Sequence, residues 1–217
     1  MALETDSSDR ALVVRERRGV LEILAGNVVL LSSAALGTER ELGRLAGQVV
    51  ARPLRRVLVG GLGFGATLRG VLDVAPPDAR VIVAEKVAAI EQLVRGEHGH
   101  LSGRPLDDPR AEVTLRDVAD VMADAAGPDG ALDAILLDVD NGPHWASFRG
   151  NARLYTPAGL AVAHRALAPG GALAVWSGYP ADAFLARLRA AGFAPSRVLL
   201  RERGQVRARA YVGVRRG

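Results

Sequence analysis

The sequence predicts an α/β protein built on a mostly parallel sheet with helices on both faces. From about residue 55 onward, short apolar runs alternate with amphipathic segments of helical period. A glycine-rich turn directly follows the first of these runs, and several later runs end in a carboxylate. Repeated strand–helix alternation requires parallel strands joined by crossover helices, which cover both faces of the sheet.

The beginning of the chain predicts a small antiparallel sheet. Residues 12–32 contain three short segments with the alternation and the length of strands. Glycine-containing pairs at residues 18–19 and 26–27 separate these segments and are typical of tight turns. We therefore expect a short β-meander in this part of the chain.

A helix is expected after the meander. Thr38, with Glu41 three residues later, has the pattern of a capping box, and Pro53 provides a stop. The pattern of strand–helix alternation begins just after this point. We expect residues 1–52 to form a small N-terminal unit of meander plus helix, and residues 53–217 to form the main domain.

The sequence pattern of the main domain predicts five strand–helix units followed by a hairpin. The expected strands cover residues 55–61, 80–85, 111–117, 131–140 and 172–178. The first expected helix ends near residue 74, and the other four cover residues 86–96, 118–126, 156–171 and 180–193. Residues 197–204 and 207–216 then predict two antiparallel strands around a turn at Gly204.

The composition limits the classes of site that the chain can hold. The absence of cysteine excludes a disulfide framework, a thiol nucleophile and a cysteine-based zinc site, and it fits a reducing cytoplasm. The first ten residues are polar, unlike a secretory signal, and no apolar run approaches the roughly 18 residues that span a bilayer. We therefore expect a cytoplasmic protein with no membrane partner.

The basic charge does not by itself indicate nucleic-acid binding. The chain has 28 Lys+Arg against 24 Asp+Glu and a net charge of +4. Lys86 is the single lysine, and the arginines are spread along the sequence rather than gathered in blocks. This usage is typical of a GC-rich coding sequence and a solvated surface, so no nucleic-acid partner is expected.

The first candidate binding element is the glycine-rich turn after residues 55–61. Gly61, Gly63 and Gly65 lie between a buried strand and a helix, where glycine allows a tight turn and a close approach of the backbone to a ligand. We predict that these three glycines bind the nucleoside part of a substrate. A purely structural strand–helix turn is the alternative.

Two carboxylates extend this candidate nucleoside site. Glu85 ends the second expected strand, 22 residues after Gly63, where an acidic residue typically accepts hydrogen bonds from ribose hydroxyls. Asp117 ends the third and could accept a hydrogen bond from an adenine amino group or cap the next helix. Glu85 could instead belong to a solvent-facing charged surface with Lys86.

The candidate catalytic group follows the fourth expected strand. Asp138 and Asp140 come directly after the apolar run at residues 131–137, where carboxylates are costly without a purpose. One of the two could act as a general base toward an amine or bind a cationic group. His144 and Trp145 follow and could line the substrate pocket or simply pack in the loop. The alternative is a loop in which the two aspartates only cap the local backbone and face solvent.

Together these elements resemble the spermidine synthase family of polyamine aminopropyltransferases, within the class I S-adenosylmethionine-dependent methyltransferase superfamily. The likeness covers residues 55–192 and rests on GGLGFGATLR, Glu85, Asp117 and LLDVDNGP. It implies a Rossmann-like class I methyltransferase sheet with a C-terminal antiparallel hairpin. It also implies that Asp138 is the base, and that a shortened small β-domain precedes the sheet. A homodimer through that N-terminal segment is a further implication.

The sequence departs from the family pattern at two places. Phe64 stands where the family's GGGDGG loop has the aspartate that holds the amine of decarboxylated S-adenosylmethionine. The D-x-x-D-P loop is one residue shorter, so Asp140 matches the second aspartate only approximately. These departures leave the identity of the transferred group open.

Three functions follow from the resemblance and its departures. The first is a transferase that uses decarboxylated S-adenosylmethionine, or a related nucleoside, to alkylate a small-molecule amine. The second is a methyltransferase that uses S-adenosylmethionine as the co-substrate. The third is a nucleoside-binding protein without catalysis. Apart from His98 and His100 in a glycine-flanked loop, the histidines have no spacing typical of a metal site, and no metal is expected.

Overall fold

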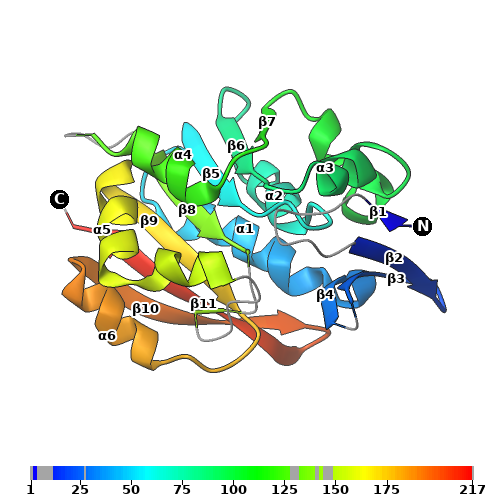
Figure 1. The fold of residues 1–217 in the computed structure, drawn as a ribbon. Helices are drawn as coiled ribbons and strands as arrows, with labels where there is room; N and C mark the ends of the chain where they lie inside the picture. The colour runs from blue at the N-terminus through cyan, green and yellow to red at the C-terminus, as the bar shows by residue number, and fades with distance from the viewer. Residues whose placement is uncertain are drawn as a thin grey trace.

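The computed structural model describes residues 2–3, 12–26, 28–127, 132–139, 142–143 and 149–216. Its main element is a seven-stranded sheet in the order β10-β11-β9-β8-β5-β6-β7 (Figure 1). The strands are β5 (Arg56–Gly60), β6 (Arg80–Ala84), β7 (Ala111–Thr114), β8 (Leu132–Leu137), β9 (Leu167–Ser177), β10 (Phe193–Glu202) and β11 (Gln205–Arg215). Strand β11 pairs antiparallel with both of its neighbours, and all other pairs are parallel. The predicted sheet with a C-terminal hairpin is therefore confirmed.

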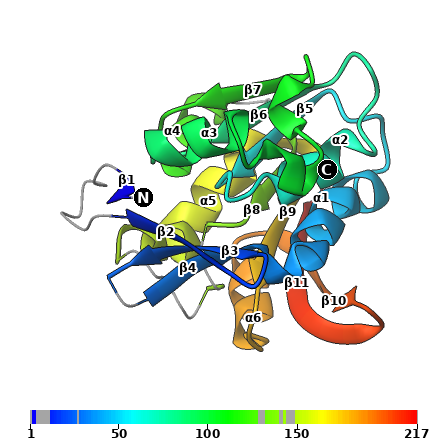
Figure 2. The same cartoon turned by 90° about the vertical axis from the view of Figure 1, so that its right-hand side faces the viewer.

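Helices cover both faces of this sheet (Figures 1 and 2). One apolar core joins the sheet to α1 (Gly37–Val49), α2 (Ala66–Leu72) and α3 (Ala88–Arg95). The other core joins it to α4 (Val118–Ala125), α5 (Pro157–Ala166) and α6 (Ala183–Ala190). Successive residues of β5 alternate between the two cores, because neighbouring side chains of a strand point to opposite faces.

A second, smaller sheet precedes α1 and lies beside the main sheet (Figure 2). It is antiparallel, in the order β1-β2-β3-β4. The strands are β1 (Ala2–Leu3), β2 (Leu12–Arg17), β3 (Val20–Ala25) and β4 (Val28–Ser32). The predicted meander corresponds to β2–β4, and β1 was not expected. The boundary between residues 52 and 53 stays a prediction.

The predicted capping box of the first helix is wrong. Helix α1 begins at Gly37, and its N-cap is Leu36, which makes no side-chain capping bond. Thr38 lies inside the helix, where its hydroxyl accepts a hydrogen bond from Trp176 Nε1 at 3.3 Å. Glu41 instead accepts a hydrogen bond from the backbone N–H of Arg201. Contacts with distant strands therefore replace the local cap that the sequence pattern favours.

The predicted end of the fourth main-domain helix is also wrong. Helix α5 ends at Ala166, and Leu167 already begins β9. Leu167 pairs with Leu132 and Ala172 with Ala134, so the strand bulges between these pairs. Gly170, with φ of 75°, lies within this bulge. Sequence periodicity cannot detect such a bulge, because it depends on pairing with β8.

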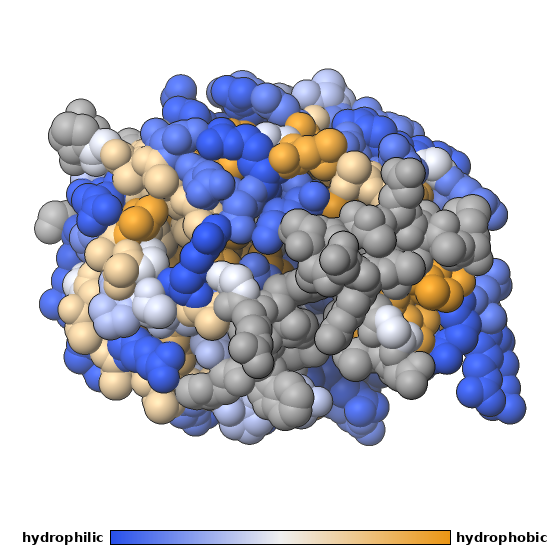
Figure 3. Space-filling model, in the orientation of Figure 1, coloured by the Kyte–Doolittle hydropathy of each residue, from blue (hydrophilic) through white to orange (hydrophobic). Residues whose placement is uncertain are grey.

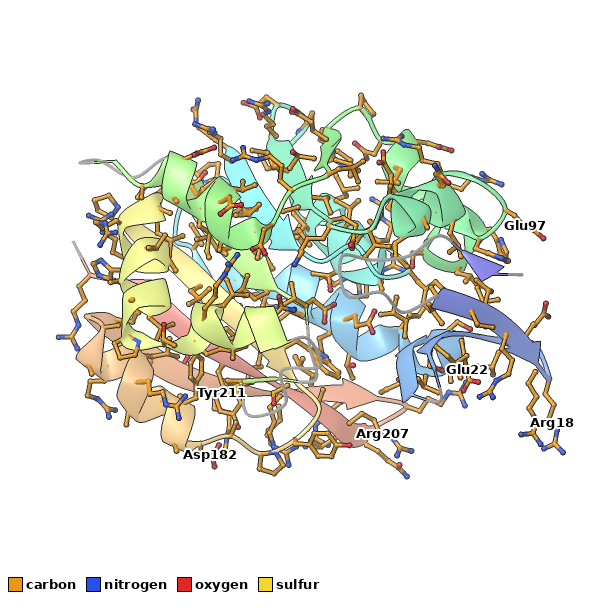
Figure 4. All side chains as sticks on the ribbon, in the orientation of Figure 1. Arg18, Glu22, Glu97, Asp182, Arg207 and Tyr211 are labelled. Atoms are coloured by element: carbon orange, nitrogen blue, oxygen red, sulfur yellow. The ribbon has the colours of Figure 1, made fainter. Side chains whose placement is uncertain are left out.

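Charged side chains surround the cores. The labelled Arg18, Glu97 and Arg207 lie at the periphery of the molecule (Figure 4). On the face in Figure 3, hydrophobic residues form small separate patches among hydrophilic ones. The hydroxyl of Tyr211 donates to the carboxylate of Asp182 at 3.0 Å near helix α6. Within the described ranges, no helix is long and apolar enough to cross a membrane.

Candidate functional site

The candidate site lies where the strand order of the main sheet reverses. Strands β5 and β8 are neighbours at its centre; the chain continues from β5 toward β6 and from β8 toward β9. In open α/β sheets, ligands bind outside the carboxyl ends of the strands at such a point. The backbone N–H of Asp138 donates to the carbonyl of Gly60 at 2.9 Å, which joins the two strand ends.

The glycine loop has the backbone conformation that glycine was predicted to allow. Gly61, Gly63 and Gly65 have φ values of 87°, 51° and 82°. A Cβ atom on Gly61 would lie 2.5 Å from the carbonyl oxygen of Asp138. Gly65 is the N-cap of α2. The loop is therefore required for the strand–helix turn, and its predicted contact with a nucleoside stays a prediction.

Glu85 connects this loop to the end of β6. One carboxylate oxygen accepts a hydrogen bond from the backbone N–H of Leu62 at 3.0 Å. The other accepts from the N–H groups of Lys86 and Val87, both at 2.8 Å. Glu85 thus fixes the glycine loop against the neighbouring strand end. This places it beside the loop, as a ribose-binding residue would need to be.

Asp117 caps a helix and binds two cations. Its carboxylate accepts from the N–H of Ala119 at 2.9 Å, which confirms the capping interpretation. The same carboxylate forms ion pairs with Arg153 at 2.8 Å and Lys86 at 3.4 Å. Burial raises the pKa of Asp117, but the amide and the two cations outweigh it and lower the pKa. A contact with adenine stays a prediction.

Asp138 has a different environment. Its Oδ2 accepts a hydrogen bond from the hydroxyl of Thr67 at 2.6 Å. Burial raises its pKa to about 6, although the Thr67 bond acts in the opposite direction. A carboxylate with such a pKa can accept a proton near neutral pH. Asp140, His144 and Trp145, the other residues predicted for this loop, lie outside the described residues.

Glu39 is the residue of this site that sequence reasoning missed. The hydroxyl of Thr67 lies 3.2 Å from its carbonyl oxygen and also contacts Asp138. Burial raises the pKa of the Glu39 carboxyl well above its usual value, and the charges of Asp138 and Glu202 add to the effect. The charges of two acidic side chains, from β10 and from the end of β8, therefore act on the carboxyl of an α1 residue.

Close packing of α1 against α2 explains the position of Glu39. A Cβ atom on Gly70 would lie 2.0 Å from the carbonyl oxygen of Arg40, and one on Gly43 would lie 2.2 Å from that of Thr67. The two helix backbones can approach only because both positions are glycine. Glycines inside two apolar-periodic helices were the sequence signal for this contact. The signal does not identify which helices pair.

Three aromatic side chains of the main domain lie in packed positions. Trp176 is partly buried in β9, with its indole nitrogen bonded to Thr38. Tyr155 is buried and packs edge-on against Phe184, with ring centroids 5.9 Å apart. Phe64 is 1% exposed and belongs to the core of the α1–α3 face. In the ranges that the structure covers, no three His, Asp or Glu residues are arranged to hold a metal ion.

Comparison with characterised proteins gives related sequences for part of the chain. A polyamine aminopropyltransferase of Mycobacterium tuberculosis is 32% identical over 146 residues, which cover 64% of this chain and 27% of that protein. Polyamine aminopropyltransferase 1 of Hyperthermus butylicus is 34% identical over 130 residues, covering 57% and 41%. The chain thus matches about a quarter to two fifths of the length of these relatives. No family model matches it.

Solved structures show the same fold over the whole chain. Spermidine synthase from Thermotoga maritima superposes with a TM-score of 0.76 at 18% identity, covering 100% of this chain and 73% of that one. A spermidine synthase in complex with the transition state analogue AdoDATO gives 0.73 at 18% identity, covering 100% and 72%. The chain is therefore related in sequence to the polyamine aminopropyltransferases over 64% of its length and is folded like the spermidine synthases.

Proposed function

We propose that the chain is a transferase that alkylates a small-molecule amine, with decarboxylated S-adenosylmethionine or a related nucleoside as the donor. The observation that carries this proposal is Asp138, a carboxylate with a pKa of about 6 at the switch point of the sheet. It lies beside the glycine loop, on the side away from Glu85 and Asp117. This arrangement would place a base next to the reactive end of a bound nucleoside.

The proposed reaction needs positioning and one proton acceptor. The lone pair of the acceptor nitrogen attacks the aminopropyl carbon bonded to the sulfonium sulfur. The new C–N bond forms as the C–S bond breaks, and the sulfur keeps the bonding electrons, so methylthioadenosine leaves neutral. Asp138 accepts a proton from the nitrogen. Holding the amine in line with the C–S bond supplies a large part of the rate, and the base typically adds about 10²–10⁴-fold.

Methyl transfer from S-adenosylmethionine is a second candidate, and one observation favours it. Phe64 is buried in the core, so the glycine loop presents no side-chain carboxylate to the amine of a decarboxylated donor. S-adenosylmethionine, which keeps its carboxylate, would not depend on a contact with the missing aspartate. The two candidates share the fold and the nucleoside site and differ in the group that leaves sulfur.

The products distinguish the two candidates. Purified protein is incubated with each donor and a panel of amines, and the nucleoside products are separated by chromatography. Methylthioadenosine from the decarboxylated donor supports the proposal. S-adenosylhomocysteine from S-adenosylmethionine supports methyl transfer instead. Binding of either nucleoside without turnover on the whole panel would leave the chain as a non-catalytic binding protein.

The domain boundary, the cytoplasmic location and the homodimer belong to the same proposal. The separate sheet β1–β4 is consistent with a small N-terminal unit. Dimerisation through this unit is suggested by the family resemblance. Sedimentation of the full chain, compared with a chain lacking residues 1–32, tests it: loss of a dimer in the shorter chain is the expected result.

A further inference from the structure

Thr67 is a buried polar residue with no part in the proposed proton transfer. It lies in the first turn of α2, two residues after Gly65, and is 1% exposed. Its hydroxyl lies 2.6 Å from Asp138 Oδ2 and 3.2 Å from the carbonyl oxygen of Glu39 in α1. Thr67 therefore joins the proposed base at the end of β8 to both α1 and α2.

The packing of α1 on α2 fixes the position of this hydroxyl. A Cβ atom on Gly43 would lie 2.2 Å from the carbonyl oxygen of Thr67, and one on Gly70 would lie 2.0 Å from that of Arg40. Two helix backbones in such close contact leave little room for residue 67 to shift. Because threonine is branched at Cβ, its side chain also has few rotamers in a helix. The hydroxyl is therefore held in place against the carboxyl of Asp138.

The single hydrogen of the Thr67 hydroxyl has two acceptors. A hydroxyl donates one hydrogen bond, and both Asp138 Oδ2 and the Glu39 carbonyl lie within its reach. When Asp138 is ionised, the shorter distance and the negative charge favour donation to Oδ2, since hydrogen bonds to charged groups are stronger than those to neutral groups. When Asp138 is neutral, the hydrogen can turn to the Glu39 carbonyl. The hydroxyl thus keeps an acceptor in both protonation states of the base.

The same contact distinguishes the two oxygens of the Asp138 carboxyl. Within the described ranges, Oδ2 is bonded to Thr67, and Oδ1 has no hydrogen-bond partner. Asp138 is partly exposed, whereas Thr67 is buried. Oδ1 is therefore the oxygen that a substrate nitrogen can reach.

We propose that Thr67 is a positioning residue for the base: its hydroxyl holds Oδ2 of Asp138, so that Oδ1 takes the proton from the acceptor nitrogen. This role rests on the proposed function, in which Asp138 accepts a proton from an amine. Removal of the hydroxyl frees the carboxyl to rotate and makes its ionised form less stable. Because the Thr67 bond lowers the pKa of Asp138 against the effect of burial, that pKa rises when the bond is lost.

Three variants separate the hydroxyl from the rest of the side chain. Thr67→Val removes the hydroxyl at nearly constant shape, and Thr67→Ser keeps the hydroxyl and removes the methyl group. Thr38→Val is the matched control, because Thr38 is also buried and its hydroxyl bonds to Trp176 Nε1. Formation of the nucleoside product gives kcat, KM for the amine and the pH dependence of kcat/KM. Glu39 and Glu202, the other acidic groups near Asp138, are unchanged in all three variants.

The expected result is specific to the hydroxyl at position 67. In Thr67→Val, kcat at pH 8.5 falls about 10-fold because the ionised base is no longer oriented, while KM for the amine is unchanged. The midpoint of its kcat/KM profile rises by about half to one pH unit, the difference between a hydrogen bond to a charged group and one to a neutral group. Thr67→Ser and Thr38→Val keep the wild-type midpoint. An unchanged midpoint in Thr67→Val, or an equal rise in Thr38→Val, would overturn the proposal.

A measurement on wild-type protein covers the case in which Thr67→Val does not fold. The carboxyl carbon signal of Asp138 and the hydroxyl proton signal of Thr67 are followed by NMR from pH 4 to pH 8. We expect both to titrate with one midpoint near 6, since the hydroxyl changes its acceptor as Asp138 changes its charge. A Thr67 hydroxyl signal that does not change with pH overturns the proposal.

The NMR titration also separates this inference from the proposed function, because it needs no turnover. Joint titration of Thr67 and Asp138 in a protein that forms no nucleoside product supports their coupling and contradicts only the function. Turnover in which Thr67→Val leaves both the Asp138 midpoint and kcat unchanged contradicts only the inference.

Discussion

Two aspartates, which follow strands β7 and β8 of the main sheet, have opposite electrostatic environments. Asp117 caps α4 and is paired with Arg153 and Lys86, so its pKa is lowered. Asp138 has a threonine hydroxyl as its partner, and burial raises its pKa to about 6. The first is suited to stay ionised and accept hydrogen bonds. The second is suited to gain and lose a proton.

Under the proposed function, the difference divides the site into two halves with separate tasks. The nucleoside side, which we define as Gly61–Gly65, Glu85 and Asp117, is made of backbone turns, caps and ion pairs. The acidic side, defined as Glu39, Asp138 and Glu202, combines carboxyls without described cationic partners. Groups whose environments push their pKa values apart often take different roles in one reaction.

The largest effect is expected from Asp138→Asn. If Asp138 is the proton acceptor, the amide lowers turnover by about 10²–10⁴-fold. In wild type, kcat/KM should rise with pH through about 6, because the carboxylate must be ionised to accept a proton. Methylthioadenosine formation measures both. Asp78→Asn, in the exposed turn before β6, should leave the rate within two-fold, and an equal loss in both variants would refute the role of Asp138.

Gly61→Ala should damage the nucleoside side through sterics alone. The new Cβ would lie 2.5 Å from the Asp138 carbonyl at a φ of 87°. Gly19→Ala is the matched control, since Gly19 has a φ of 74° and nothing within 4 Å. Backbone strain costs about 1 kcal/mol at either position. For Gly61→Ala, the free energy of unfolding in urea should be lower by at least a further roughly 1–2 kcal/mol, because the new Cβ overpacks the site. Similar losses in the two variants would mean that the loop can shift.

The carboxyls of the acidic side and those of the nucleoside side should contribute to folding stability with opposite pH dependence. A carboxyl whose folded pKa is raised favours folding most below its unfolded pKa. That advantage for Asp138 is lost as pH rises from 3.8 to about 6. Asp138→Asn should therefore be more stable than wild type above pH 6, and Glu39→Gln should behave alike. A gain of about 1 kcal/mol raises the melting temperature by roughly 2–4 °C in a domain of this size. A lower melting temperature for both variants at pH 8 would contradict the account.

The smallest effect is expected from Asp117→Asn. Asparagine caps helices as well as aspartate does, so only the ion pairs with Arg153 and Lys86 are lost. Both cations are substantially exposed, and the cost should be about 0.5 kcal/mol. Asp117→Ala also removes the cap and should cost about 1 kcal/mol more. Because the pKa of Asp117 is lowered, its contribution is present above pH 3.8 and is lost as pH falls through the folded value. Thermal melts of the two variants at pH 7 and pH 3 measure this difference.

The sequence predicted the sheet and the positions of the glycine turn, Glu85 and Asp117 because their signals are local, while the contact of these residues with a nucleoside stays a prediction. A glycine turn follows β5, and Glu85 and Asp117 follow the next two strands, so their positions along the chain determine their positions in the fold. The cap by Asp117 was one of the two roles that the sequence left open for this residue, and the structure shows it. The bulge that begins β9 and the partners of Thr38 and Glu41 depend on distant strands, and the local pattern therefore predicted them wrongly.

Glu39 was missed for the same reason. It comes from a helix assigned to the N-terminal unit. Because Gly43 and Gly70 let α1 and α2 approach, its carbonyl oxygen lies 3.2 Å from the Thr67 hydroxyl, which also contacts Asp138. Its carboxyl lies near Glu202, which is far along the chain. A site assembled from three separate segments has no sequence spacing to reveal it.

The opposed protonation of Asp117 and Asp138 is the central claim, and carboxyl carbon NMR measures it directly. Aspartate labelled at the side-chain carboxyl carbon, with Asp117→Asn and Asp138→Asn to assign the two signals, is followed from pH 3 to pH 8. The account predicts that the Asp138 signal titrates with a midpoint near 6, while the Asp117 signal keeps its ionised shift down to below pH 3.8. Titration of both signals together near pH 4 would contradict it.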